Sequence, residues 1–324
     1  MVCEVVLNRF LVAVCASGRT SLVETIEEIS RQVNRSQHDC SLLIVANGTG
    51  VAQFLLNLSH RESWDCAILD ETSIGIPFAR NAALRWAIRQ GYSHLGFVDD
   101  DCVPEPFWLD TLISKFTEDL EVDVVAGSWS IEPASPPSPF IPRDEWGNQW
   151  YRVKGRPVCD GEDLPHAYTR NVMFTLRSPR FSIAEFGFDE SRANLGGSDV
   201  KFFAELVSAG ARILFAENAS VKEIYSGERL TLGWHSRRKL RNAQFILERA
   251  IFGERIYMRK SVASLLLAGL FWISGVRIYL VKERRTNNFF SRDTVGQVVF
   301  LASYIAGILG FNLKLIFEEY KTKQ

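Results

Sequence analysis

Short apolar runs alternate with amphipathic stretches along the first two-thirds of the chain. Buried strands are predicted at Phe10–Val14, Leu42–Val45, Ala67–Leu69, Leu95–Val98, Val122–Ala126, Tyr168–Leu176 and Arg212–Phe215. Helices are predicted from Leu22 to Val33, from Ala79 to Gln90 and from Val200 to Ala209. Ser21 with Glu24 resembles a capping box for the first helix, and Ser198 is the expected cap of the last. This alternation is typical of βα units on a mostly parallel sheet, so we expect an α/β fold.

Two later regions depart from this pattern. Ile131–Pro165 is rich in proline and holds Trp146, Trp150 and Tyr151, which predicts a long irregular segment of functional importance or high mobility. Val262–Val281 and Val295–Phe311 are apolar and close to the shortest length that spans a bilayer. Basic residues flank both stretches, so we expect them to cross a membrane or to lie on anionic lipid. A buried helical pair in a soluble domain remains the alternative.

Composition narrows the classes of function. The chain has 324 residues, of which 47% are hydrophobic, so it can form a substantial core. Its formal net charge of −1 gives no support for nucleic-acid binding, which normally shows a basic domain. The six cysteines are spread singly without a C-x-x-C pair, which favours reduced thiols over a zinc site.

Three adjacent carboxylates, Asp99, Asp100 and Asp101, follow the strand predicted at Leu95–Val98. They therefore emerge at the carboxyl edge of the sheet, where open α/β folds bind ligands. Adjacent carboxylates repel one another unless they are solvated or share a cation, and hard oxygen ligands suit Mg²⁺ or Mn²⁺. The triplet by itself fits a metal site or a solvated turn.

Three stretches in fixed order resemble glycosyltransferase family 2. The first runs from Gly75-Ile76-Pro77-Phe78-Ala79-Arg80-Asn81 through Phe97-Val98-Asp99-Asp100-Asp101 to Trp108-Leu109. The second is Phe188-Asp189 followed by Gly196-Gly197-Ser198-Asp199. The third, Arg229–Trp234 with Arg237, Arg238 and Arg241, is similar to the arginine-rich end of bacterial exopolysaccharide enzymes of the succinoglycan type. The resemblance covers residues 8–245.

The resemblance implies a GT-A fold, a nucleotide-diphosphate-sugar donor and inversion at the anomeric carbon. Residues 1–126 would form the nucleotide-binding half of a catalytic domain, residues 127–245 its acceptor half, and residues 246–324 a membrane-associated helical region. The Q-x-x-R-W motif of processive synthases is absent, which favours transfer of one sugar per encounter.

The resemblance also suggests site residues. Asp101 with Asp99 would hold Mn²⁺ or Mg²⁺ and neutralise the leaving diphosphate. Asp199 would act as general base on the acceptor hydroxyl, although a carboxylate there also suits a helix N-terminus. The nucleotide sugar would be bound by Ala16, Ser17, Arg19, Asn47, Arg80, Asp99, Asp100, Asn171, Arg229 and Arg238.

Several of these assignments have alternatives. Arg80 lies at a predicted helix start, which suits phosphate, but it also fits a surface arginine. The arginines after residue 228 suit either a diphosphate or lipid headgroups. Trp146, Trp150 and Tyr151 suit stacking on sugar faces or anchoring of their loop.

Three positions depart from the family pattern. Ala46 stands where an aspartate commonly reads the base, which leaves uridine recognition open. Ser198 replaces the glutamate of the "GGED" segment, and Arg170 replaces the usual glycine before Asn171.

The expected function is transfer of one sugar from a UDP-sugar to a polyprenyl-diphosphate-linked saccharide. The catalytic domain would face the cytoplasm at the inner membrane, with membrane lipid as a further partner and no nucleic acid. A nucleotidyltransferase and an inactive nucleotide-sugar-binding scaffold remain as alternatives.

Overall fold

A computed structural model of the chain describes residues 8–19, 21–62, 64–142, 145–149, 151–153, 156–193, 196–239 and 242. The chain divides into two compact units, one of residues 1–132 with 147–224 and one of residues 133–146 with 225–324. The sequence boundaries expected at residues 126 and 245 stay predictions.

The first half of the first unit alternates strands and helices. It contains β1 (Arg9–Ala16), α1 (Leu22–Arg35), β2 (Asp39–Asn47), α2 (Val51–Glu62), β3 (Ala67–Glu71), α3 (Ile76–Arg89), β4 (His94–Asp99), β5 (Cys102–Pro104) and α4 (Trp108–Glu118). The predicted strands before Asp99 are confirmed with longer bounds. Sequence reasoning did not predict α2 and α4.

The second half begins with β6 (Val124–Pro133). The irregular segment that follows contains four short strands, β7 (Gly147–Gln149), β8 (Arg152–Val153), β9 (Arg156–Pro157) and β10 (Asp163–Leu164). Then come β11 (Asn171–Thr175), the 3₁₀ turns η2 (Ile183–Glu185) and η3 (Glu190–Arg192), α5 (Ser198–Ser208) and β12 (Ile213–Tyr225). In the second unit, η4 (Gly227–Leu230) is followed by helical residues 232–239.

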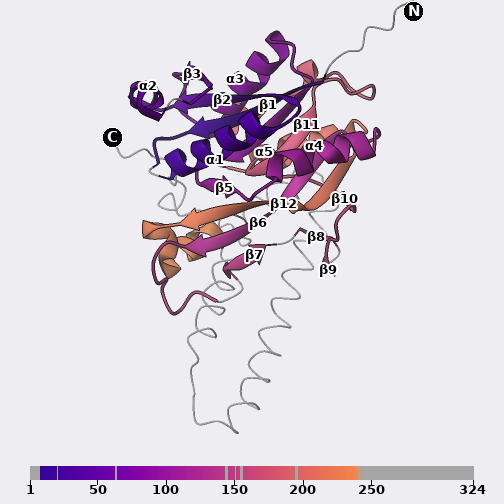
Figure 1. Cartoon of the computed structure of the whole chain (residues 1–324). Helices are drawn as coiled ribbons and strands as arrows, with labels where there is room; N and C mark the ends of the chain where they lie inside the picture. Colours follow the sequence, from indigo (N-terminus) through magenta and orange to yellow (C-terminus); the bar gives the residue numbers. More distant parts are fainter. Residues whose placement is uncertain are drawn as a thin grey trace, which may run out of the picture. The chain divides into compact units, whose positions relative to one another are not determined.

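The main sheet has the strand order β10-β12-β6-β11-β4-β1-β2-β3 (Figure 1), with β5 added to β12 and β7 added to β6. The strands β4, β1, β2 and β3 are parallel. β11 runs antiparallel to both of its neighbours, β4 and β6. The expected mostly parallel sheet is therefore mixed, because β11 enters between two neighbours without a crossover helix.

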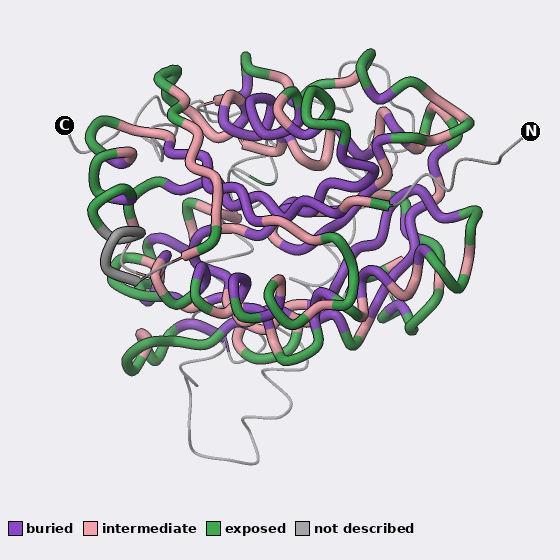
Figure 2. The backbone as a smooth tube through the Cα atoms, turned by 45° about the horizontal axis from the view of Figure 1, so that its top comes forward, coloured by how far each residue is buried: buried purple, intermediate pink, exposed green. Residues whose placement is uncertain are grey.

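Helices cover both faces of this sheet. α1 and α4 pack on the face that carries Phe10, Val12 and Val14 of β1, while α3 and α5 pack on the face that carries Leu11 and Ala13. Figure 2 shows the buried backbone concentrated in the central strands. Burial on both faces explains why β1 is a continuous apolar run instead of an alternating one.

Two predicted helix caps are wrong. The Ser21 side chain does not cap α1, because its hydroxyl donates to the backbone oxygen of Asp100 at 3.2 Å. The residue that caps α5 is Gly197, in the left-handed region at φ 73°, and Ser198 is the first helical residue. Both serines are thus engaged with the region around the carboxylate triplet.

The two apolar stretches between residues 262 and 311 lie outside the described residues, and their membrane association remains a prediction. Within the ranges that are described, no helix is long and apolar enough to cross a membrane.

Candidate active site

The carboxylate triplet lies where β4 ends beside β1. Cys15 of β1 is opposite Asp99 in the parallel register. The Asp100 carboxylate accepts hydrogen bonds from the backbone N–H of Ser17 at 2.8 Å and from the Ser17 hydroxyl at 2.7 Å. Asp100 and Ser17 thus tie the loop after β1 to the end of β4, and the Asp100 carboxylate is used inside the protein rather than presented to a ligand.

Arg19 pairs with the remaining oxygen of the Asp100 carboxylate and with the Asp101 carboxylate. Its Nη1 forms an ion pair with Asp101 and lies 3.1 Å from Oδ1 of Asp100. Both aspartates are buried, whereas the Arg19 side chain is 40% exposed. The predicted residues Ser17, Arg19, Asp100 and Asp101 therefore do gather at one place.

Arg80 connects the triplet to a segment that is distant in sequence. This buried arginine of α3 places Nη2 3.5 Å from Oδ1 of Asp99 and donates from Nη1 to the Ser198 hydroxyl at 3.2 Å. Its guanidinium carbon also lies 5.7 Å from the centre of the Phe188 ring. Arg80 is therefore a bridge between the end of β4 and the start of α5, not a surface arginine.

Asp199 follows Ser198 in the first turn of α5 and is partly exposed. One oxygen accepts the backbone N–H of Val200 at 2.9 Å. The carboxylate is stabilised there by the N-terminal end of the helix dipole. Asp199 directly follows the serine whose hydroxyl accepts the hydrogen bond from Arg80.

Sequence reasoning missed a further acid, Glu223. It is buried in β12 and pairs with Arg170, whose Nη1 lies 2.5 Å from Oε2. Arg170 in turn lies 4.9 Å from the ring centre of Trp129. The backbone of Glu223 faces Cys102 in β5, so this acid lies next to the triplet. The sequence held a signal, because Glu223 alternates in phase with Ala219, Val221 and Tyr225, all of which are buried in β12.

Burial raises the pKa of Asp99 to about 6, even though Arg80 favours its charged form. The same cause raises the pKa of Asp100, against the opposing charge of Arg19 and the hydrogen bonds from Ser17. About a third of the Asp99 side chain is still exposed. A group that is both accessible and crowded by like charges is suited to binding a cation.

Two predicted ligand contacts are occupied by the protein itself. Asn47 donates to the backbone oxygens of Glu71 and Ser73 and accepts the N–H of Gly75, so it shapes the loop between β3 and α3. Asn171 donates to the oxygens of Ser128 and Ala219 and accepts from Trp108. Both amides have used their N–H donors, and we reinterpret these asparagines as structural.

Ala16, which was also predicted to bind the nucleotide sugar, is the last residue of β1 and is fully buried. Any contact it makes to a ligand would therefore come through its backbone.

The predicted arginines of the second unit form a separate group with aromatic rings. Arg238 lies 5.0 Å from the Trp234 ring centre and donates to the Tyr225 hydroxyl at 2.9 Å. Arg229 lies 5.0 Å from the ring centre of Tyr225 and 5.7 Å from that of Trp234. Trp234 thus has two guanidinium groups near its ring. Arg241 lies outside the described residues.

The aromatic residues of the irregular segment anchor it. Trp146 packs edge-on against Tyr225 and His235 of the same unit. Tyr151 is buried and stacks on Tyr168. These contacts favour anchoring over sugar stacking for both residues, and Trp150 is not among the described residues.

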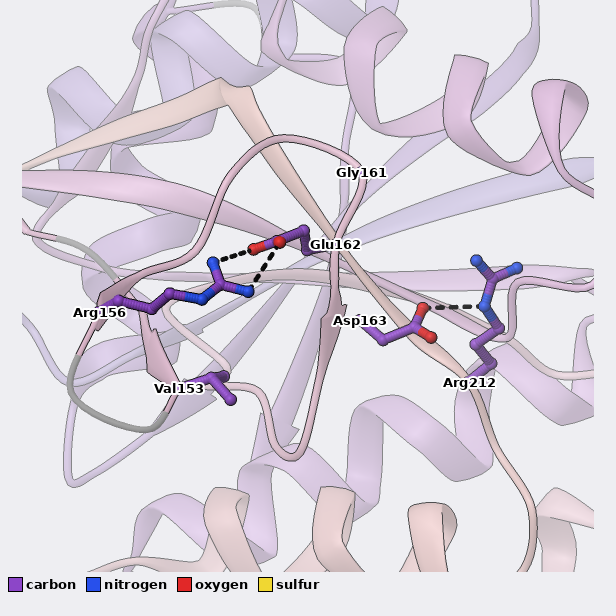
Figure 3. Close-up of a pocket in the computed structure, with 6 residues that line it drawn as sticks. All are labelled: Val153, Arg156, Gly161, Glu162, Asp163 and Arg212. Carbon is purple, nitrogen blue, oxygen red and sulfur yellow. Dashed lines mark hydrogen bonds and ion pairs between the residues drawn. The ribbon is translucent and has the colours of Figure 1, made fainter.

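A surface hollow of about 330 Å³ lies elsewhere in the first unit. Figure 3 shows its lining, where Arg156 pairs with Glu162 and Arg212 pairs with Asp163. Asp163 faces Leu214 at the start of β12. The backbone N–H of Val124, at the start of β6, also donates to the backbone oxygen of Arg212. The hollow therefore lies at the amino edge of the sheet, opposite the end that carries Asp99.

The residues described here contain no group of three or more histidine, cysteine, aspartate or glutamate side chains placed to hold a metal ion. The triplet instead offers two carboxylates, Asp99 and Asp101, beside the buried Asp100. This donor set suits Mg²⁺ or Mn²⁺ in sites that share the cation with phosphate oxygens, because such sites use only one or two protein carboxylates. The Asp101 carboxylate already holds a cation, the Arg19 guanidinium.

Comparison with known proteins shows the class of fold. The chain is 24% identical over 320 residues to the succinoglycan biosynthesis protein ExoM of Rhizobium meliloti (strain 1021), covering 97% of this chain and 96% of the relative. A mannosyltransferase from Pyrobaculum calidifontis, solved with GDP-Man and Mn²⁺, superposes with a TM-score of 0.56 at 14% identity, over 94% of this chain and 88% of that one. The fold is therefore a GT-A-like α/β fold.

The family comparison covers the part of the chain that forms the carboxylate edge. The model of glycosyl transferase family 2 matches residues 11–174, from β1 through β11. That range includes Arg19, Arg80 and the aspartate triplet but ends before Asp199. The chain belongs to glycosyl transferase family 2 and is a glycosyltransferase.

Proposed function

We propose that the protein transfers one sugar from a nucleotide-diphosphate sugar to a growing exopolysaccharide unit, with inversion at the anomeric carbon. The Arg80 bridge carries this proposal, because it joins Asp99 at the donor edge to Ser198, the neighbour of Asp199. A single displacement needs a leaving-group site and a base within one cavity, and this bridge supplies the connection. Similarity to the succinoglycan biosynthesis protein along nearly the whole chain supports the exopolysaccharide class.

Asp99 and Asp101 are the proposed ligands of Mn²⁺ or Mg²⁺. When bound, the cation would neutralise the charge that develops on the departing nucleoside diphosphate. The solved mannosyltransferase that shares this fold was obtained with Mn²⁺, which supports a divalent cation. Arg80 has a different task, because its buried guanidinium lies beside Oδ1 of Asp99 and orients that carboxylate.

Asp199 is the proposed general base. Its carboxylate would accept the proton of the acceptor hydroxyl as that oxygen attacks the anomeric carbon, and the nucleoside diphosphate would leave from the opposite face. Proton transfer of this kind contributes about 10²–10⁴ in rate. One Asp199 oxygen is already directed to the N–H of Val200, so the other oxygen is the proposed acceptor of that proton.

The donor nucleotide is proposed to be UDP. Ala46 is buried and Asn47 is committed to its loop, so base selection would rest on backbone groups at the ends of β1 and β2. GDP is the competing candidate, because the mannosyltransferase of similar fold binds GDP-Man.

The proposed acceptor is a saccharide linked to polyprenyl diphosphate at the cytoplasmic face of the inner membrane. Arg229 and Arg238, arranged around Trp234, offer two cations of fixed orientation, which suit a diphosphate. Residues 262–311 would hold the enzyme at the lipid surface. A chain that lacks them is expected to remain in the supernatant when mixed with anionic vesicles, and sedimentation of that chain with lipid would contradict the proposed anchor.

Calorimetric titration with UDP and with GDP, each with and without Mn²⁺, tests the donor proposal. One nucleotide is expected to bind tightly only when Mn²⁺ is present. Asp101→Asn is expected to remove the dependence on Mn²⁺, whereas Asp39→Asn, in an exposed ion pair with Arg9, serves as the matched control. Equal binding with and without Mn²⁺ in the unaltered protein would contradict a metal-dependent donor site.

Two alternative functions remain to be distinguished, a nucleotidyltransferase and an inactive nucleotide-sugar-binding scaffold. Family membership decides against a nucleotidyltransferase. An inactive scaffold would bind the nucleotide but would neither hydrolyse nor transfer the donor sugar.

A further inference from the structure

Three arginines compensate the acids at the carboxylate edge, and they are not equivalent. Arg80 pairs with Asp99, Arg170 with Glu223, and Arg19 with Asp100 and Asp101. The Arg80 side chain is 8% exposed and that of Arg170 is 16% exposed, whereas that of Arg19 is 40% exposed. Arg19 is therefore the cation of this group that can leave its position without opening the core.

The local backbone also distinguishes Arg19. Arg80 is held within α3, and Arg170 is held against the Trp129 ring. Arg19 belongs instead to the loop after β1 and follows Gly18, which has a φ of 83° that favours glycine. Ser17 anchors this loop to Asp100 two residues earlier. The anchor fixes where the loop starts while the long Arg19 side chain extends from a half-exposed position.

The Asp101 carboxylate is the one at which two cations would compete. It is buried, it pairs with Arg19, and the proposed function makes it a ligand of the divalent cation. A divalent ion and a guanidinium bound to the same carboxylate would repel each other strongly, because both would lie within about 4 Å of it. This repulsion disfavours simultaneous binding of both cations to Asp101, which is buried and partly shielded from water.

We propose that Arg19 is a stand-in cation, which holds Asp101 in the free enzyme and is displaced when the divalent cation enters with the donor. The inference rests on the proposed function. Displacement frees the guanidinium next to the phosphates that the cation also contacts, so Arg19 moves from Asp101 to the donor diphosphate. Entry of the cation alone is disfavoured, since nothing then takes up the charge of Arg19. The cation and the nucleotide consequently strengthen each other's binding, by equal factors in both directions.

Titration of the full chain with Mn²⁺ alone, followed by the electron paramagnetic resonance signal of free Mn²⁺, tests this exchange. Arg19→Gln is expected to bind Mn²⁺ at least about tenfold more tightly than the unaltered protein, because the competing charge is gone. Arg19→Lys retains that charge and is expected to stay close to the unaltered protein. Arg156→Gln makes the same charge change in an exposed pair with Glu162 and should leave Mn²⁺ affinity unchanged.

Repeating the Mn²⁺ titration with saturating UDP or GDP measures the coupling. The nucleotide is expected to tighten Mn²⁺ binding strongly in the unaltered protein and much less in Arg19→Gln, where no exchange is needed. Equal Mn²⁺ affinity of Arg19→Gln and the unaltered protein, with binding lost in Asp101→Asn, would overturn the exchange while leaving the proposed metal site intact. Absence of Mn²⁺ binding in every variant, with and without nucleotide, would overturn the metal-dependent function itself.

Discussion

The two edges of the main sheet carry the same kinds of side chain in different arrangements. At the amino edge, Asp123 accepts hydrogen bonds from Ser178, from Arg180 and from the backbone of Arg212. These partners come from the segment after β11 and from the residue before β12, and together they surround a buried carboxylate. At the carboxyl edge, Arg80 joins β4 to α5 instead. Pairs at both edges join separate elements, but the Asp123 side chain is only 2% exposed whereas that of Asp99 is 35% exposed. The accessible carboxylate is the one that can bind a ligand.

The surface hollow lined by Arg156, Glu162, Asp163 and Arg212 (Figure 3) also lies at the amino edge. Its charges are paired with each other and exposed, and exposed pairs contribute little to binding or stability. The carboxyl edge has its buried acids and arginines drawn from several elements. An accessible carboxylate within a network of buried charges therefore distinguishes the candidate site better than concavity does in this molecule.

The largest expected effect is that of Asp199→Asn at the carboxyl edge. Loss of the proposed base should lower the rate of sugar transfer by about a thousandfold, within the range known for general-base catalysis. Nucleotide affinity should be unchanged, because the side chain keeps its size and its place in α5. Transfer assays with the cognate donor measure the effect, and Asp163→Asn at the amino edge is the control. Turnover within a few-fold of the unaltered enzyme would remove Asp199 from the mechanism.

A smaller effect is expected from His94, which begins β4 at the amino edge. Burial lowers the pKa of His94 to about 4, and its ring stacks 4.7 Å from that of Phe10. The unfolded chain has a histidine pKa near ~6.5, so the unfolded state takes up the proton first as the pH falls. The stability contributed by neutral His94 is complete above pH ~6.5 and is lost towards pH 4, by about 2–3 kcal/mol.

Urea unfolding at pH 7.5 and pH 4.5 measures that loss. His94→Leu should show a smaller decrease in unfolding free energy between the two pH values, whatever its absolute stability. The exposed His38→Gln is the matched control and should keep the full decrease. An unchanged decrease in His94→Leu would show that other groups govern the acid sensitivity.

The smallest of these effects is expected for Arg180→Met at the amino edge. The buried Asp123 carboxylate would lose the bond from Nη1 of Arg180, which is 2.9 Å long, but would keep those from Ser178 and Arg212. A cost of about 2 kcal/mol in unfolding free energy is expected, with no change in the rate of transfer. Chemical denaturation and a transfer assay together measure it. A loss of transfer without a loss of stability would abolish the distinction between the two edges.

The sequence predicted the strands up to Asp99 and the aspartate triplet, but not α2, α4, Glu223 or the connections between the charged residues. The motif predicts Arg80 at a helix start, whereas α3 begins one turn earlier at Ile76, and no spacing rule shows that the Arg80 guanidinium reaches Ser198. The hydrogen bonds of Asn47 could not be predicted for the same reason, because its amide meets a loop that only the folded chain brings near. Ser21 was read as a cap from local spacing, but the backbone oxygen of Asp100 competes successfully for its hydroxyl.

Glu223 shows what a closer reading could have added. The alternation of buried and partly exposed positions along β12 places this acid among the buried ones, where a charge requires a partner. In the sequence, Arg170 stands out only as a departure from the family pattern. An acid on a buried strand position and an unusual arginine together indicate a pair, although only the fold shows that the two residues meet.

The pairing of β5 with β12 has a consequence for how this protein is made. The N–H of Ile224 donates to the backbone oxygen of Asp101, and Val221, Lys222 and Glu223 face the strand that follows the triplet. During synthesis the aspartates leave the ribosome long before β12 does, so they remain without this support until nearly the whole first unit has been translated. A shortened chain that ends before β12 would still contain the signature residues of the family but would not hold them in their working arrangement.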